Sequence, residues 1–182
     1  VAIGNDGDFS VAGFGNGTGS LSVGRDRVAI GTESGIRVNG SVNVAIGGEV
    51  GNDVTGQENV ALAGLHAGQN VTGNQNIAIG SDAGNGITAS RTISMGQGAT
   101  ASKDDAIAIG TSATAYITNN VALGANSVDR AAVQISSATV QGRTATLNAD
   151  GTITYTAGPA VTYSGFAGTA TGVVSVGKAG AE

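Results

Sequence analysis

Few residues of this chain are of the types that carry catalytic or metal chemistry. The sequence holds one histidine, His66, and no cysteine, so neither a thiolate metal site nor a disulfide framework can form. Asp104 and Asp105 are adjacent acids, but neighbouring residues of a strand or turn diverge, whereas acid–base catalysis needs two carboxyl groups that converge. The segment at residues 5–8, NDGD, lacks the spaced ligands and the terminal glutamate of a calcium loop. The sequence therefore predicts no catalytic residue, no metal ion and no cofactor.

The composition argues against further classes of function. The net charge is −5 and the basic residues are scattered, whereas nucleic-acid binding needs clustered lysine and arginine. No apolar run reaches the roughly 20 residues that span a bilayer, so we expect contact with a membrane only through an anchor outside this sequence. The chain opens on a repeat unit, and we expect it to be a piece of a longer protein. With 32 glycines and 3% aromatic residues it lacks the large side chains that fill a wide core, which favours a narrow structure with tight turns.

A tetrapeptide of the pattern hydrophobic–small–hydrophobic–glycine recurs along the chain. Its clearest copies begin at Val1, Leu21, Val28, Val44, Ile77, Ile93, Ile107, Val121 and Val174. Between residues 93 and 124 the copies follow one another every 14 residues, and a second motif with two alanines comes after the glycine, as at Ala99 and Ala101. Short alternating runs separated by glycine predict two β-strands in each unit.

Stacked units of this kind predict an all-β fold, a parallel β-roll with coils of 14 to 17 residues. Side chains alternate faces along a strand, so the two large residues of each tetrapeptide share one face and the small residue takes the other. We expect the large residues to form the core of the roll: Val28, Ile30, Val44, Ile46, Ile77, Ile79, Ile93, Met95, Ile107, Ile109, Val121 and Leu123. A thin roll buries little apolar area, so we expect copies to associate through a smooth outer face of small residues: Ala45, Ala78, Ser94, Ala108 and Ala122.

These repeats resemble the YadA-like heads of trimeric autotransporter adhesins of Gram-negative bacteria. That family's repeat is similar to N-x-V-A-I-G-x-x-A-x-A, and residues 43–47 (NVAIG) and 110–115 (GTSATA) fit its two halves. Near the C-terminal end, residues 163–168 (YSGFAG) and 172–182 look like a head insert motif that leads into the family's neck. The resemblance implies a homotrimer of left-handed β-rolls, displayed on the bacterial cell surface and held in the outer membrane by a C-terminal anchor.

Residues 129–172 interrupt the repeat. Two alternating runs, residues 144–147 and 152–155, flank Asp150-Gly151, which predicts a hairpin turn, and Pro159 is expected to block the continuation of a central strand. We therefore expect a short antiparallel β-meander that folds back on the roll of its own or of a neighbouring subunit. The predicted division is 1–128 for the head repeats, 129–172 for the insert, and 173–182 for the last repeat and the start of the neck.

The function predicted from the sequence is adhesion without catalysis. The resemblance implies binding to host extracellular matrix proteins such as collagen, fibronectin and laminin, or to host cell-surface molecules. One alternative is a structural spacer that lifts a distal binding domain away from the cell. Another is a β-helical enzyme that degrades polysaccharide, which would need paired acids in a groove, and the acids here are dispersed. The sequence names no residue that contacts a ligand.

Overall fold

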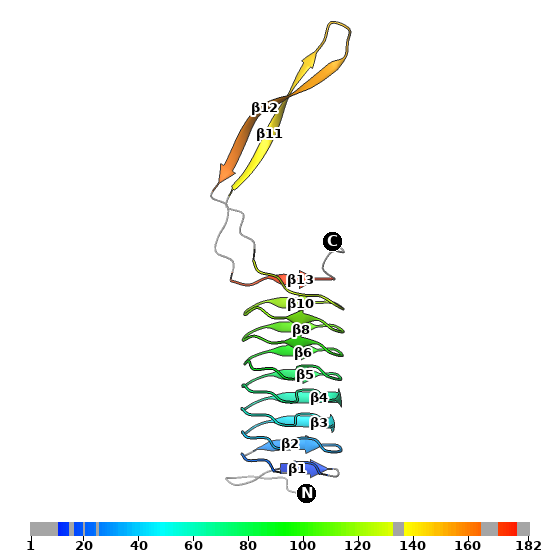
Figure 1. Cartoon of the computed structure of the whole chain (residues 1–182), viewed down its shortest axis with the longest axis vertical. Coiled ribbons are helices and arrows are strands. Elements are labelled where there is room, and N and C mark those ends of the chain that lie inside the picture. The colour runs from blue at the N-terminus through cyan, green and yellow to red at the C-terminus, as the bar shows by residue number, and fades with distance from the viewer. Residues whose placement is uncertain are drawn as a thin grey trace. The chain divides into compact units, whose positions relative to one another are not determined.

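The computed structural model describes residues 11–14, 17–19, 21–24, 26–132, 137–164 and 171–177. Their regular elements are all β-strands (Figure 1). The strands are β1 (Val11–Phe14), β2 (Arg27–Ile30), β3 (Val44–Gly48), β4 (Val60–Leu65), β5 (Ile77–Ile79), β6 (Ile93–Met95), β7 (Thr100–Ala101), β8 (Ile107–Ile109), β9 (Thr114–Ala115), β10 (Val121–Leu123), β11 (Ser137–Leu147), β12 (Ile153–Ser164) and β13 (Val174–Val176). The chain divides into a roll, residues 1–131 with 172–182, and an insert, residues 132–171.

The roll is a parallel β-solenoid. Its main wall is a nine-stranded sheet in the order β1-β2-β3-β4-β5-β6-β8-β10-β13, in which each coil adds one strand (Figure 1). The tetrapeptides stack in register, so that Val28 pairs with Val44 and Ile30 with Ile46, and the same alignment continues to β13. The predicted parallel β-roll is therefore confirmed.

The opposite wall of the roll is made by the second motif of each coil. In the 14-residue coils it forms the short strands β7 and β9, which pair in parallel. In the longer coils it forms isolated parallel bridges that join Asn39, Thr55, Thr72 and Thr88 in one column. Each coil thus runs along one wall, turns, and returns along the other.

The glycine that ends each tetrapeptide is required by the turn between the walls. Gly31 has a φ of 125°, and a Cβ built on it would lie 1.9 Å from the carbonyl oxygen of Gly47 in the next coil. Gly110 meets Gly124 in the same way, with its Cβ 2.5 Å from the carbonyl carbon. No side chain fits there, because the coils pass each other backbone against backbone.

A ladder of buried asparagines supports the turn that precedes the main wall. Asn59 Nδ2 donates to the carbonyl of Gly73 at 2.9 Å, and Asn59 Oδ1 accepts from the backbone N–H of Asn76 at 3.0 Å. Asn43 and Asn76 make the equivalent bonds in their own coils. Buried amides are stable only when they are bonded in this way, and each bond ties one coil to the next.

The insert is a two-stranded antiparallel hairpin of β11 and β12. The predicted turn at Asp150-Gly151 is present, with Gly151 at a φ of 81° and its N–H bonded to the carbonyl of Asn148 at 3.0 Å. Pro159 does not end the strand as predicted, because β12 continues to Ser164 and the proline lies at a register shift, where the ladder of hydrogen bonds is already interrupted.

The boundaries of the insert also differ slightly from those read from the sequence. Asp129 belongs to the roll, where its buried carboxylate accepts the backbone N–H groups of Tyr116 and Ile117 at 3.0 and 2.9 Å. Gly172 belongs there too, and the roll continues, as predicted, at Val173, whose carbonyl accepts a hydrogen bond from the backbone N–H of Val121 at 2.8 Å. The roll therefore resumes directly on β10. None of the elements in the described ranges is a helix able to cross a membrane.

Candidate assembly surface

The interior of the roll is lined by small residues, which overturns the predicted core. Ala45, Ala78, Ser94, Ala108 and Ala122 point inward and are at most 5% exposed. They were predicted to face a neighbouring subunit, and that prediction is wrong. The predicted core residues lie on the outside of the main wall, and none of them is buried: Val28, Ile30, Val44, Ile46, Ile77, Ile79, Ile93, Met95, Ile107, Ile109, Val121 and Leu123.

The distance between the two walls explains this arrangement. A Cβ built on Gly35 would lie 2.9 Å from the Cβ of Ala29, and one built on Gly51 would lie 2.8 Å from that of Ala45. Opposite each alanine of these coils there is thus room for a glycine and no more. A valine or isoleucine at the alanine position would collide with the opposite wall, so the large neighbours must face outward.

The width of the coil decides what else enters the interior. In the 14-residue coils the buried apolar cluster consists of alanine alone. In the longer coils the return wall contributes larger side chains, and Val38, Val54, Val71 and Ile87 form one buried column. Alanines of the second motif, such as Ala99 and Ala113, are fully buried.

The outward residues of the main wall form two columns, which we call the apolar ladders. One contains the first large residue of each tetrapeptide and the other contains the second. The strand register aligns them as Val28, Val44, Val60, Ile77, Ile93, Ile107, Val121 and Val174, and as Ile30, Ile46, Leu62, Ile79, Met95, Ile109, Leu123 and Val176.

The apolar ladders are accessible to solvent in the single chain. Ile30, Ile46 and Leu123 are 37%, 37% and 41% exposed, and Val174 and Val176 are more than half exposed. Parallel sheets are usually covered on both faces, and a contiguous apolar surface on a soluble chain marks an interaction site. Fully burying a side chain of this kind stabilises by about 1.5–3 kcal/mol relative to leaving it exposed. The outside of the main wall is therefore the surface best suited to contact another chain.

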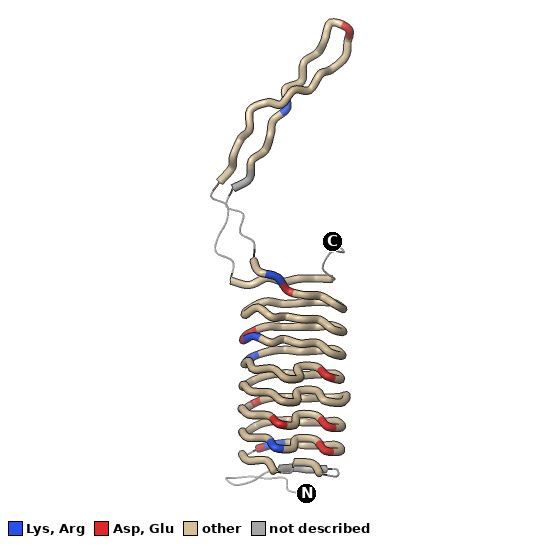
Figure 2. The backbone as a smooth tube through the Cα atoms, in the orientation of Figure 1, with Lys and Arg blue, Asp and Glu red and all other residues tan. Residues whose placement is uncertain are grey.

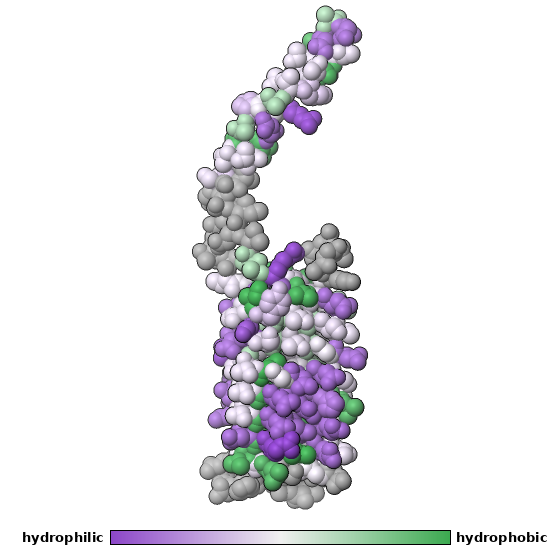
Figure 3. Space-filling model, viewed as in Figure 1, coloured by the Kyte–Doolittle hydropathy of each residue, from purple (hydrophilic) through white to green (hydrophobic). Residues whose placement is uncertain are grey.

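The return wall has a different chemical character. Its outward column of Asn39, Thr55, Thr72 and Thr88 is polar and exposed. In the view of Figure 3, hydrophilic residues gather on part of the roll, at the height of the coils of β2 to β5. We call the outside of the return wall, with Asn39, Thr55, Thr72 and Thr88, the polar wall. Charged residues occur at its first coils and at the edges of the coils (Figure 2), where each coil turns from one wall to the other.

The charged residues pair along the stack. Arg37 forms a bidentate ion pair with Asp53 of the next coil, and this hydrogen bond lowers the pKa of Asp53. Arg91 does the same with Asp105, whose pKa is also lowered, and lies 3.6 Å from Asp104. Both adjacent acids thus lie against the same arginine, Arg91. Each pair links one coil to the next at the surface, where solvent weakens its contribution to stability.

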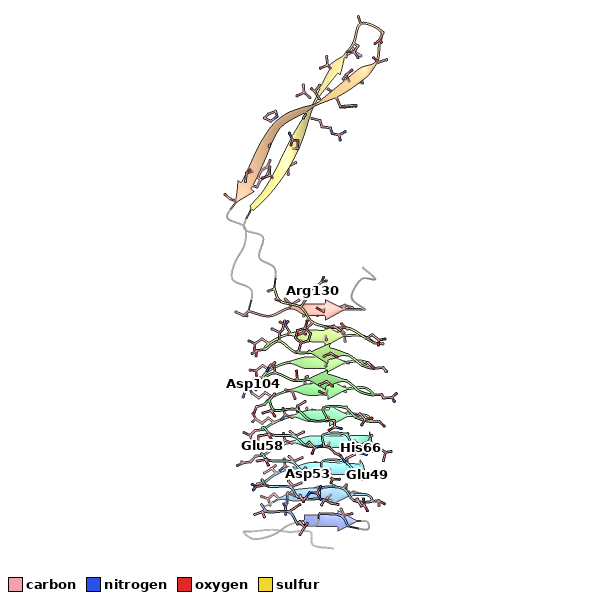
Figure 4. The ribbon with its side chains drawn as sticks, viewed as in Figure 1. Glu49, Asp53, Glu58, His66, Asp104 and Arg130 are labelled. Atoms are coloured by element: carbon pink, nitrogen blue, oxygen red, sulfur yellow. The ribbon has the colours of Figure 1, made fainter. Side chains whose placement is uncertain are left out.

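His66 lies between two acids on the coils on either side of its own. Its Nε2 is 3.2 Å from Glu49 Oε2 and its Nδ1 is 3.2 Å from Asp82 Oδ1, and all three side chains are 40% exposed or more. Figure 4 shows Glu49 and His66 at one edge of the roll, and Glu58 and Asp104 at the other. Across the described part of the chain, no group of histidine and acidic side chains is arranged to hold a metal ion. Residues 5–8 lie outside the described residues.

Comparison with known proteins identifies the repeat. The fold defines a parallel β-solenoid with one apolar and one polar wall, the form of a repeat protein that stacks its units. The YadA head domain repeat matches twice, at residues 88–113 and 101–127. Residues 88–127 therefore contain two copies of the YadA head domain repeat, which supports a YadA-like head domain. No curated protein and no solved structure matches the chain.

The sequence contained a signal that would have assigned the two faces correctly. In each tetrapeptide the residue between the large ones is alanine or serine. In three of the longer coils a glycine follows this alanine by six residues: Gly35 after Ala29, Gly51 after Ala45 and Gly84 after Ala78. An alanine paired with a glycine in successive coils indicates two backbones in close contact. Hydrophobic character alone could not show which face of the strand points into the roll, because a surface that another subunit covers can be apolar in the way a core is.

Proposed function

We propose that this chain is the head of a cell-surface adhesin and that three copies assemble through the apolar ladders. The observation that carries the assembly is the continuous apolar surface along the main wall, which one chain leaves uncovered. The number three comes from the YadA-like repeat. With the apolar ladders turned toward the three-fold axis, the polar walls of the three copies face outward.

The outward polar walls are the proposed surface for a host ligand. They are uncharged over long stretches and rich in hydroxyl and amide groups, as in the column of Asn39, Thr55, Thr72 and Thr88. Such groups recur in four successive coils, so a long ligand such as a fibrous matrix protein can contact several coils at once. Three copies raise the effective concentration of sites without a strong contact at any one of them. We propose collagen, fibronectin, laminin or a host surface molecule as the ligand class.

Sedimentation with light scattering tests the assembly. We expect a mass of about three times 17.5 kDa for the parent chain. The substitution Ile93→Asp places a charge on an apolar ladder and should remove the trimer, because burying an unpaired charge costs several kcal/mol. The matched control Thr88→Asp adds the same charge to the exposed polar wall and should keep the trimer. An Ile93→Asp chain with unchanged mass and melting temperature would show that the ladders are not the interface.

Solid-phase binding to purified matrix proteins tests the adhesive role. The trimer should bind at least one of them, and acidic substitutions such as Thr72→Asp on the polar wall should weaken that binding without changing the mass. A trimer that binds none of the matrix proteins and no host cells would favour the spacer function instead.

A further inference from the structure

The hairpin of β11 and β12 has no core of its own. Its apolar side chains are 49% to 72% exposed: Val140, Leu147, Ile153, Tyr155, Val161 and Tyr163. It contains two charged residues, Arg143 and Asp150, among its described residues. An isolated two-stranded hairpin is at best marginally stable in water, so this hairpin needs a surface to cover its apolar side chains.

The apolar pairs occupy opposite faces in the two halves of the hairpin. Directly opposed residues of an antiparallel pair share a face, and faces alternate along each strand. Near the base, Val140 pairs with Val161, and the alternate face there carries Thr139 and Thr162. Near the tip, the apolar pair of Leu147 and Ile153 lies on the face of β11 that carries its odd-numbered residues. At the base of the hairpin, that same face carries the polar residue Thr139. The apolar pairs therefore lie on opposite faces of the ribbon in its two halves.

The change coincides with an irregularity in the ladder. The register shifts between Gln141 and Arg143, where β12 carries one more residue than β11. Two glycines meet there, and a Cβ on Gly158 would lie 3.2 Å from the backbone of Gly142. A bulge of this kind increases the right-handed twist of the strands. In Figure 1 the two strands cross once, so the ribbon presents one face to the viewer below the crossing and the other face above it.

The twist of the ribbon brings the apolar pairs of its two halves to the same side. The pairs lie on opposite faces of the ribbon, but the ribbon turns over between them, so both sets of apolar side chains point the same way in space. Figure 3 shows hydrophobic patches in both halves of the hairpin from one viewpoint. The other side carries threonines, among them Thr139 and Thr162 at the base and Thr144 and Thr156 toward the tip. The hairpin thus carries the apolar pairs of both halves on one side, interrupted next to the register shift by Arg143, which lies on the odd-numbered face of β11.

We propose that this apolar side packs against the same side of the hairpins of neighbouring copies. The hairpin leaves the roll after Ala131 and returns at Gly172, between β10 and β13, whose residues Val121 and Val174 are the last rungs of one apolar ladder. In the sequence, the hairpin is thus inserted between the last two strands that carry the apolar ladders. The inference rests on the proposed trimer, because the neighbouring hairpins are supplied by the other copies.

Single cysteines test this contact, because the chain has none of its own. Val140→Cys and Leu147→Cys lie on the apolar side of the two halves, and Thr144→Cys on the threonine side is the matched control. Mild oxidation, or a short bismaleimide linker, should join two chains in most trimers of the first two variants and in few of the control. A hairpin that packs on a roll places no two identical cysteines together, so it would give no such product.

The outcomes separate this inference from the proposed function. A parent chain that sediments as a monomer overturns both. A trimeric parent whose Val140→Cys and Leu147→Cys variants link no better than Thr144→Cys overturns the hairpin contact alone. Deletion of residues 132–171 should lower the melting temperature of the trimer. A deletion variant that keeps the melting temperature but loses binding to matrix proteins would assign the hairpin to the ligand and overturn the contact.

Discussion

The substitution Ala108→Val tests which residues fill the roll. Ala108 is fully buried in a cluster made of alanine alone, on the strand β8 between Ile107 and Ile109. Valine adds two methyl groups where the interior accepts one. Overpacking of a closed core costs roughly 1–3 kcal/mol per chain, and for a domain of this size each kcal/mol lowers the melting temperature by about 2–4 °C. We therefore expect a fall of roughly 2–12 °C, measured by circular dichroism.

The control for this prediction is Ile109→Val on the same strand. Ile109 points outward to one of the apolar ladders, so shortening it by one carbon leaves the inside of the roll unchanged. Even where a neighbouring copy covers it, the change costs no more than the roughly 0.5–1.5 kcal/mol that it costs in a core. If the large residues filled the roll, Ala108→Val would be neutral and Ile109→Val would be the damaging change. Melting temperatures in that order would refute the arrangement of the two walls.

Further substitutions test the contacts that hold the coils together. Gly51→Ala should destabilise the chain by more than about 1 kcal/mol, because the position has a φ of 61° and the new Cβ would lie 2.8 Å from the Cβ of Ala45. An unchanged midpoint of denaturant unfolding would contradict the close approach of the two walls. Asn59→Ala should cost about 1–3 kcal/mol by leaving buried backbone groups of the next coil unpaired, and its melting curve should show this without loss of β-structure at low temperature. The pKa of Asp53 is lowered by Arg37, so the pair stabilises the fold above the ordinary aspartate pKa near 3.9, and this contribution is lost as the pH falls through the lower value in the folded chain. Asp53→Asn should therefore reduce the dependence of stability on pH below about 4, and an identical acid-unfolding profile would exclude the pair as a contributor.

In the insert, the turn could be predicted from the residues that form it, whereas the pairing of the two strands could be known only from the structure. The turn at Asp150-Gly151 follows from its residues, because glycine accepts the positive φ and the aspartate side chain bonds the backbone of Thr152 at 3.0 Å. The alternation of apolar residues in the strands was visible in the sequence as well. What it could not supply was the register shift at Gly142, which decides on which side in space the apolar pairs of the two halves lie.

The sequence by itself determined the coil. The spacing of the tetrapeptides fixes the period, their alternation fixes the strand, and the glycines fix the turns, since all three depend on residues close together in the chain. Only the tertiary structure decided which face of the strand is inside. That choice depends on the distance to the opposite wall, where Gly35 faces Ala29 and Gly51 faces Ala45, and on the space that this distance leaves for a side chain. A pattern of period two is satisfied equally well by either face, so packing between the walls had to choose between them.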